Sequence, residues 1–521
     1  MPATRAGAAR PPLVAAVDAG TTGARAMAYD LNGRLVAEVR RPYRTSSPRP
    51  GWAEQDARDW AEGAVAALRG LGTRTWGAGQ IRAIGLTGQC PTMVVADSRG
   101  RPLRAGMMYR DNRAVAEARQ MRDRVGDQAM HERTGHLPEA FHVGPKLLWI
   151  RQHEPEVFAR TRLVFQPRDV VLHRLSGVAA TDETNANATL LFNLRQRAWD
   201  PELLAAFGVD PALFPAALPP WAQAAELPER AAAELGLRAG VPLVIGAADS
   251  QCAAFGAGVI APGPVSEMAG ASSCLNSVVL SPLADLRVTH YSHVVPDCFS
   301  TELGVNTTGA AISWAVRALG YPGFGDLAAD AARFRRRLGR GMGGRGAGGR
   351  GARGGVAAVE AAPLFLPYLG DGERDDPTAR AGFVGLSDRH DRAALAFAVV
   401  EGVALGVRSV LAVLEQAGSP LSELRVGGGG ARLDLAGQLK ADLLGRPVVH
   451  LDIDPAGFGA AMLAADAAGL SGEAGAAIAA TVRRARRFAP SGSLSAFEGE
   501  RATWFDRVRP SAAVHSPREL T

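Results

Sequence analysis

Apolar runs of five or six residues, each ended by small or polar residues, recur along the chain and predict β-strands. The first three runs cover residues 13–17, 25–29 and 34–39. A turn at residues 18–23 separates the first two runs, and Asn32-Gly33, a pair typical of hairpin turns, separates the second two. The N-terminal pattern therefore predicts strand, tight turn, strand, turn, strand.

A second hairpin of the same layout is predicted in the middle of the chain. Two strand-like runs, 265–268 and 274–280, flank the small-residue turn 269–273. The Gly-Thr-Thr of the first turn is matched by Gly-Ala-Ser-Ser in the second, but Met268 stands where the first turn begins with Asp18. The layout is repeated, and only one copy carries a carboxylate.

Both turns carry groups that suit a nucleotide. Closely spaced backbone N–H groups and hydroxyls bind phosphate oxygens, and the Asp18 carboxylate suits a hydrated Mg²⁺. The two turns therefore indicate two halves that hold one nucleotide from opposite sides. The alternative is a pair of ordinary hairpins with Asp18 as a turn residue, because Gly and Ser turns are common.

Segments with helical periodicity alternate with the strands. Helices are predicted at residues 111–124, 145–153, 251–256 and 393–413, further strands at 81–86, 243–245 and 424–426, and a polar loop at 181–185. This mixture predicts an α/β fold. A chain of 521 residues is too long for one compact core, so we expect two domains.

The expected division of the chain has a tail at each end and one insert. Residues 1–12 are expected to form a flexible tail, 13–242 the N-terminal domain, 243–489 the C-terminal domain, and 490–521 a C-terminal helix and tail. Within the second domain, residues 339–355 are an Arg/Gly-rich insert that has too few apolar residues to bury a core.

Composition narrows the classes of function. Hydrophobic residues make up 47% and charged residues 21% of the chain, as in ordinary globular proteins. The net charge of +6 and the Arg/Gly insert raise nucleic-acid binding as an alternative, but the Arg-rich composition is typical of a GC-biased genome, and we expect no nucleic-acid partner. Four cysteines without CxxC spacing, no signal-peptide pattern and no apolar run of membrane length predict a cytoplasmic protein without a membrane partner.

Asp249 is the candidate proton acceptor of a reaction. It follows the apolar strand 243–245 and precedes the predicted helix 251–256, so its carboxylate can project from the end of the strand. Phosphoryl transfer to an alcohol needs positioning, charge neutralisation and one acceptor for the hydroxyl proton. Asp18 and the two turns supply the first two requirements, and Asp249 supplies the third. Helix capping is the alternative role of Asp249.

Further motifs accompany these features along nearly the whole chain. They are Asp18 to Thr21 with Arg25, Gly85 to Gln89, Tyr109 with Asp111 and Arg113, Pro145 to Trp149, Arg168 with Asp169, Thr181 with Asp182, Asp249, Gly270 to Ser273, and the glycine run that continues to Arg432. In this order they resemble the FGGY family of carbohydrate kinases, and within it the xylulokinase-like members. Glycines also permit close approach of a flat ligand such as adenosine, although a flexible turn is the alternative.

The resemblance implies two actin-like, ribonuclease H-like domains that flank a nucleotide and sugar cleft, with ATP and Mg²⁺ as cofactors. It implies that Asp249 takes the hydroxyl proton and that Asp18 holds the metal, directly or through water. The other implied site residues fall into three groups, which are phosphate-binding Thr21, Thr22, Arg25, Gly270, Ser272 and Gly309, adenosine-binding Gly428, Gly429 and Ala431, and sugar-facing Gln89, Cys90, Tyr109, Asp111 and Ser250.

The implied substrate is a small sugar, in first place a ketopentose such as D-xylulose, with ribulose, gluconate or a pentitol as alternatives. Cys90-Pro91-Thr92 stands where xylulokinases typically carry Met-His-Gly, and Ser250 stands where Asn or Gln is common, so this chain departs from the family where the substrate is chosen. Many relatives are dimers, which implies a homodimer. The remaining alternative is a non-catalytic actin-like ATP-binding regulator, against which the presence of both Asp18 and Asp249 argues.

Overall fold

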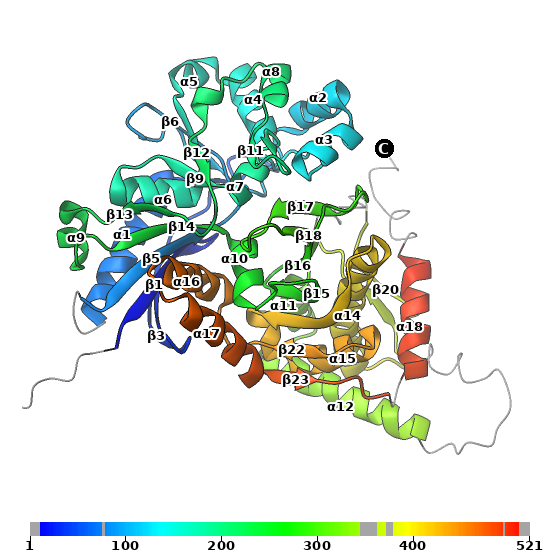
Figure 1. Ribbon diagram of the computed structural model, residues 1–521. Coiled ribbons are helices and arrows are strands. Elements are labelled where there is room, and N and C mark those ends of the chain that lie inside the picture. The colour runs from blue at the N-terminus through cyan, green and yellow to red at the C-terminus, as the bar shows by residue number, and fades with distance from the viewer. Residues whose placement is uncertain (1–10, 75–78, 344–361, 371–378, 493–494, 510–521) are drawn as a thin grey trace, which may run out of the picture. The chain divides into compact units, whose positions relative to one another are not determined.

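The computed structural model describes residues 11–74, 79–343, 362–370, 379–492 and 495–509 (Figure 1). The chain divides into two compact units. The first comprises residues 1–260, 280–300 and 454–483, and the second comprises residues 261–279, 301–453 and 484–521. Each unit contains one large mixed β-sheet with helices packed against it, so the predicted α/β class is confirmed.

The sheet of the first unit has the strand order β13-β14-β5-β1-β2-β3. Its strands are β1 (Leu13–Ala19), β2 (Gly23–Asp30), β3 (Leu35–Pro42), β5 (Ile81–Gly88), β13 (Gln223–Glu226) and β14 (Pro242–Ala248). β1, β2 and β3 pair as the predicted antiparallel hairpins, whereas β5 lies parallel to both β1 and β14. The predicted succession of strands and turns at the N-terminus is confirmed.

Helices bury both faces of this sheet. Ala15 and Val17 of β1 belong to a core that also contains side chains of α1 (Ala57–Arg74) and α6 (Pro167–Ser176). Val14 and Ala16 point to the opposite face and are buried as well, because α16 (Pro455–Ala467) packs there against β1, β5 and β14. Glycine at position 85 permits this close packing, since a Cβ there would overlap the carbonyl oxygen of Ala460.

A second helical region follows β5 in the first unit. Its helices α2 (Val115–Val125), α3 (Asp127–Thr134), α4 (Val143–His153) and α5 (Pro155–Arg160) contribute to a separate apolar core. The helix predicted at residues 111–124 begins only at Val115, because the Asp111 carboxylate accepts the backbone N–H groups of Ala53 and Arg113 and holds a turn there.

The prediction of a polar loop at residues 181–185 was wrong. This segment forms the end of β9 (Ala180–Asp182) and most of α7 (Glu183–Asn187). Asp182 caps α7 by accepting the N–H groups of Thr184 and Asn185, and it also forms a buried ion pair with Arg168. Polar residues can be buried here because they are paired with one another.

The division into units differs from the expected boundary at residue 243. That boundary lies at the start of β14, which pairs with β5 inside the first sheet, so β14 and α10 (Asp249–Gly256) belong to the first unit together with the returning segment 454–483. The remaining elements of the first unit are β4 (Glu54–Gln55), β6 (Val94–Ala96), β7 (Gly106–Met107), β8 (Leu163–Phe165), β10 (Phe192–Asn193), β11 (Ala198–Trp199), α8 (Pro201–Phe207), η1 (Pro211–Leu213), β12 (Ala216–Leu218), α9 (Glu229–Leu235), β17 (Thr289–Ser292) and nearly all of α17 (Ser471–Arg484).

The second unit repeats the strand pairing of the first. Its strands follow the order β18-β16-β15-β21-β22-β23 and are β15 (Gly263–Ala269), β16 (Ser273–Val279), β18 (Phe299–Val305), β21 (Leu421–Gly427), β22 (Val448–His450) and β23 (Arg486–Phe488). β15 and β16 form the predicted second hairpin, and β15 is parallel to β21. β15 therefore has the same two kinds of partner as β1, an antiparallel hairpin strand and a parallel strand.

The other elements of the second unit are α11 (Gly309–Ala318), α12 (Phe324–Gly343), β19 (Leu364–Leu366), β20 (Gly382–Val384), α14 (Arg392–Gln416), η2 (Gly429–Arg432), α15 (Asp434–Leu444) and α18 (Ser495–Val508). Contrary to the expectation that no apolar run reaches membrane length, α14 is long and apolar enough to cross a membrane. However, 78% of its most apolar stretch is buried within the protein, as in the core helices of many proteins.

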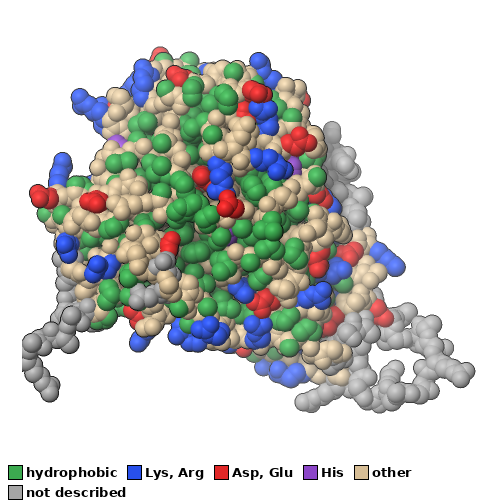
Figure 2. Space-filling model, viewed as in Figure 1, with side chains coloured by type: hydrophobic (Ala, Val, Ile, Leu, Met, Phe, Trp, Pro, Cys, Tyr) green, Lys and Arg blue, Asp and Glu red, His purple; other side chains and the backbone are tan. Residues whose placement is uncertain are grey.

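Two predicted segments fall only partly on the described residues. Of the Arg/Gly insert predicted at 339–355, residues 339–343 are the last residues of α12, and 344–355 lie outside the described residues. Of the predicted end segment 490–521, the structure describes α18, and 510–521 lie outside the described residues, as do 1–10 of the predicted tail. On the face shown in Figure 2, Lys and Arg side chains are interspersed with Asp and Glu side chains.

Candidate active site

The ends of three neighbouring strands bring the main candidate residues of the first unit to one edge of its sheet. In the register of β1, β5 and β14, Asp18 lies opposite Thr87, and Thr87 lies opposite Ala247. Gln89 and Asp249 follow directly after β5 and β14. Because these three strands are parallel, their carboxyl ends meet at the same edge, which is where open α/β sheets bind ligands.

Asp18 has one bound and one unbound carboxylate oxygen. Its side chain is nearly buried, and Oδ2 accepts hydrogen bonds from Nη2 (2.5 Å) and Nε (3.1 Å) of Arg25, which is also paired with Asp454 at the start of α16. Oδ1 is buried and has no hydrogen-bond partner among the described residues. Since a buried oxygen without a partner is costly, Oδ1 fits a Mg²⁺ ion or one of its bound waters.

The turn between β1 and β2 is fixed through its carbonyl groups. The Gln55 amide donates to the carbonyl of Thr21 (2.7 Å), and the Gln89 amide (3.2 Å) and the Tyr43 hydroxyl donate to that of Gly20. Thr21 is half-buried and Thr22 is exposed. The structure therefore places both predicted threonines on a firmly held turn next to Asp18.

Two residues that were predicted to face a sugar are buried and hydrogen-bonded within the protein. Gln89 is 1% exposed, and its amide donates to Gly20 and Gln55 and accepts from Thr92. Asp111 is fully buried and accepts hydrogen bonds from the backbone of Ala53 and from the Arg113 guanidinium. These contacts hold both side chains in place within the protein, and their role towards a sugar stays a prediction.

The other predicted sugar-side residues are less enclosed. Cys90 and Tyr109 are half-buried, and Tyr109 donates its backbone N–H to the Thr92 hydroxyl (3.1 Å). Asp249 is half-buried at the first position of α10, where its Oδ1 accepts the N–H of Ser250 (2.8 Å). A carboxylate in the first turn of a helix interacts favourably with the helix dipole.

Lys146 of α4 is buried, and the sequence did not predict it as a site residue. Its ammonium group donates to the carbonyls of Phe141 (2.5 Å), Met108 (2.7 Å), Pro91 (3.4 Å) and Met107 (3.4 Å). Burial lowers the pKa of Lys146 to about 7. It joins the segments that carry Cys90 and Tyr109, and the rarity of lysine, which occurs twice in this chain, was the available signal.

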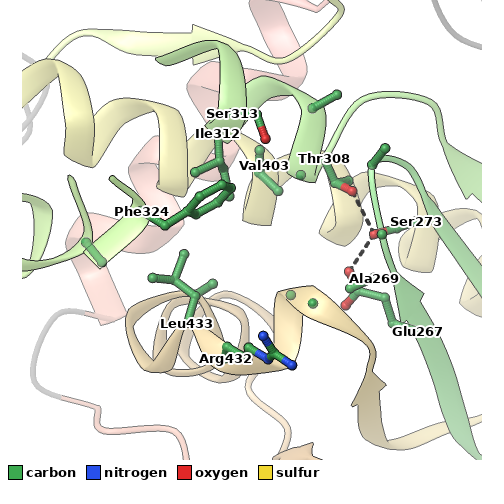
Figure 3. Close-up of a pocket in the computed structure, with 18 of the residues that line it drawn as sticks. Glu267, Ala269, Ser273, Thr308, Ile312, Ser313, Phe324, Val403, Arg432 and Leu433 are labelled. Atoms are coloured by element: carbon green, nitrogen blue, oxygen red, sulfur yellow. Dashed lines mark hydrogen bonds between the residues drawn. The ribbon is translucent and has the colours of Figure 1, made fainter. Parts of the chain in front are cut away.

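The second unit contains a pocket of about 620 Å³, which is within the range of small-molecule sites (Figure 3). Of the predicted nucleotide residues, Gly270, Gly309 and Gly429 line it, whereas Ser272, Gly428 and Ala431 do not. Ser272 is exposed, and its neighbour Ser273 faces the pocket instead, because side chains alternate along the strand that begins there.

The pocket has an apolar side and a polar end. Figure 3 shows Ile312, Phe324 and Leu433 on one side and a hydrogen-bonded group of Glu267, Ser273 and Thr308 on the other. The turn after β15 and the first residue of α11 meet at the polar end so closely that a Cβ at Gly309 would overlap the carbonyl oxygen of Gly270. A helix N-terminus beside a glycine turn is suited to phosphate groups.

Comparisons with known proteins show the family to which the chain belongs. Models of the N-terminal and C-terminal domains of the FGGY family of carbohydrate kinases match residues 13–256 and 266–468. A xylulose kinase of Bacillus subtilis is 27% identical over 88% of both chains, and a glycerol kinase of Dechloromonas aromatica is 34% identical over 92% of this chain and 93% of that one. The structure of a xylulose kinase from Rhodospirillum rubrum superposes with a TM-score of 0.82 at 29% identity, covering 96% of this chain and 99% of that one.

Proposed function

The chain belongs to the FGGY family of carbohydrate kinases, and from this premise we propose that it transfers the γ-phosphoryl group of ATP to a hydroxyl, usually primary, of a small sugar. The first candidate substrate is a ketopentose such as D-xylulose. Glycerol is a second candidate, because the glycerol kinase relative is the more similar of the two in sequence.

The observation that carries the proposal is the alignment of Asp18 and Asp249 at one edge of the first sheet. In the proposed reaction the substrate hydroxyl oxygen bonds to the γ-phosphorus, the hydroxyl proton passes to Asp249, and the bond from the γ-phosphorus to the bridging oxygen breaks, which releases ADP. Bound Mg²⁺ supplies neutralisation of phosphate charge, and Asp18 Oδ1 is the group that would hold it. Arg25 keeps the other oxygen of Asp18 in place.

The residues near the three strand ends divide into two proposed roles. Cys90, Tyr109 and Ser250 are proposed to face the sugar, whereas Gln89 and Asp111 support the segments from which they project. Thr21 and Thr22 on the first turn, and Gly270, Gly309 and Gly429 in the second-unit pocket, are proposed to contact the nucleotide.

The proposal is tested by ADP release in the presence of Mg²⁺ and ATP with D-xylulose, D-ribulose, glycerol, xylitol and gluconate as acceptors. We expect one acceptor to stimulate ADP release strongly, and Asp249→Asn to lower this rate by about 100-fold or more while ATP binding is retained. Full activity of Asp249→Asn would contradict the role of Asp249. ATP binding without stimulation by any acceptor would favour an ATP-binding regulator.

A further inference from the structure

A buried ion pair lies at the polar end of the second-unit pocket. Glu267 of β15 is 1% exposed and Lys440 of α15 is 4% exposed, and Lys440 Nζ lies 2.5 Å from Glu267 Oε2. Both residues line the pocket. Burying two charges is roughly neutral for stability at best, so the pair calls for an explanation in terms of the pocket.

Glu267 is connected to the two segments that form the polar end. Its Oε1 accepts the hydroxyl proton of Ser273 (2.8 Å), which lies directly after the turn that carries Gly270. The Ser273 and Thr308 hydroxyl oxygens are 3.1 Å apart, and Thr308 directly precedes α11. Ser273 therefore links the Glu267 carboxylate to Thr308. The carboxylate thereby holds the Ser273 hydroxyl in place between the two segments.

This arrangement has an electrostatic drawback if the pocket receives a nucleotide. A buried carboxylate at the end of the pocket repels phosphate groups, and the repulsion is stronger in a buried site than in water. Lys440 removes the difficulty, because its ammonium group cancels the charge of Glu267 without breaking the hydrogen bond to Ser273.

We propose that Lys440 is a positioning residue for nucleotide binding, which acts by compensating the charge of Glu267 so that the Glu267–Ser273–Thr308 group stays in place beside an anionic ligand. The inference rests on the proposed function, which identifies the ligand as a nucleoside di- or triphosphate. It assigns a role to two residues, 173 positions apart in the chain, that none of the sequence motifs includes.

The other charged or titratable groups near the pair do not replace Lys440. Arg432 lines the same pocket but is exposed, and its guanidinium is not paired with Glu267. His450 of β22 also faces Lys440, and its pKa is lowered to about 4 by burial and by the charges of Lys440 and Arg486. Arg486 itself is paired with Asp434. His450 is therefore neutral near pH 7.

The test compares the wild type with Lys440→Met, Glu267→Gln and the double variant in titrations with ADP, followed by calorimetry without sugar. Lys440→Met should weaken ADP binding by about tenfold or more, because the carboxylate is left uncompensated. The double variant should bind within about threefold of the wild type, since it contains neither charge. Glu267→Gln, which keeps the cation, should bind ADP at least as tightly as the wild type.

Thermal unfolding of each variant separates charge compensation from a loss of packing. A fold lost only by Lys440→Met, seen in thermal unfolding, would leave the comparison of Glu267→Gln, the double variant and the wild type as the decisive one.

The outcomes distinguish this inference from the proposed function. Equal weakening in Lys440→Met and the double variant, or unchanged binding in Lys440→Met, would overturn charge compensation. Weak binding in Glu267→Gln would also overturn it. Failure of the wild type to bind ADP or ATP at all would instead contradict the nucleotide-binding function on which the inference rests.

Discussion

The β1–β2 hairpin of the first unit and the β15–β16 hairpin of the second unit are alike in backbone and different in charge. β1 and β15 each have an antiparallel hairpin partner and a parallel neighbour. In the first hairpin Asp18 lies opposite Arg25, whereas the corresponding pair in the second hairpin is Met268 and Cys274. The carboxylate of the second hairpin, Glu267, comes one residue earlier, and a shift by one residue places it on the opposite face of the strand.

This difference shows how one backbone arrangement can serve two tasks. The Asp18 carboxylate keeps one oxygen without a partner among the described residues, which suits a cation. Both oxygens of Glu267 are bound, one by Lys440 and the other by Ser273. The pair therefore adds no net charge to the end of the pocket. The fold supplies the strand ends, and the side chains placed on them decide what each turn can bind.

The largest expected effect comes from removing the carboxylate of the first hairpin. Asp18→Asn removes the negative charge next to the first turn, and we expect kcat to fall by about 100-fold or more, because charge neutralisation on the phosphates is weakened. Steady-state rates at increasing Mg²⁺ concentration measure this effect. The matched control is Met268→Leu at the corresponding position of the second hairpin, which should stay within about threefold of the wild type. An unaltered Mg²⁺ dependence in Asp18→Asn would identify Asp18 as a turn residue.

A second prediction compares the two lysines, of which each unit has one. Lys440 is paired with a carboxylate, whereas Lys146 is held by backbone carbonyls. Lys146→Met should raise the sugar KM by about tenfold, because it releases the segments that carry Cys90 and Tyr109, and should leave the ATP KM within about twofold. Lys440→Met should reverse this pattern. A parallel rise of both KM values in either variant would remove the distinction.

A third prediction concerns the two lysines again, through the pH dependence of the free energy of unfolding that Lys146 causes. The folded protein holds Lys146 with a pKa of about 7, against 10.5 for an ordinary lysine. Between these values the unfolded chain binds more protons than the folded protein, so the contribution of Lys146 to the free energy of unfolding rises with pH over this window and is lost as the pH falls towards 7. Urea unfolding of the wild type and Lys146→Met at several pH values measures the difference. Parallel profiles of the two proteins would contradict the prediction.

The smallest expected effect concerns the polar end of the pocket. Ser273→Ala removes the hydroxyl that joins Glu267 to Thr308, and we expect ADP to bind about threefold to tenfold more weakly, as for the loss of one hydrogen bond. Ser272→Ala is the matched control, since Ser272 is exposed and does not line the pocket. Calorimetric titration measures both. A larger effect of Ser272→Ala would restore the original assignment of that serine.

The sequence alone predicted the features that depend on local pattern. The two hairpins follow from apolar runs and small-residue turns, and the long helix predicted at 393–413 lies within α14. Asp18 and Asp249 stand directly at strand ends, so their placement at one sheet edge follows once the strands are known to be parallel neighbours. The motif order also pointed to the family that the domain models match.

The contacts of the polar site residues could not be predicted from the sequence in the same way. The family resemblance implied that Gln89 and Asp111 face the sugar, and the structure adds that Gln55, Ala53 and Arg113 bind their side chains. The same applies to Glu267, whose neighbour Met268 drew attention while its own partner is far along the chain. Burial of a polar side chain is decided by which distant residues pair with it, and no local pattern carries that information.

The late position of α16 has a consequence for how the protein is made. β1, β5 and β14 lie in the first half of the chain, yet the helix that covers one face of them begins at residue 455, after most of the second unit. While the ribosome is still translating residues 301–453 of the second unit, this apolar face lacks the cover that α16 provides. The sheet whose strands emerge first is therefore completed almost last, and Arg25 gains its contact with Asp454 only then.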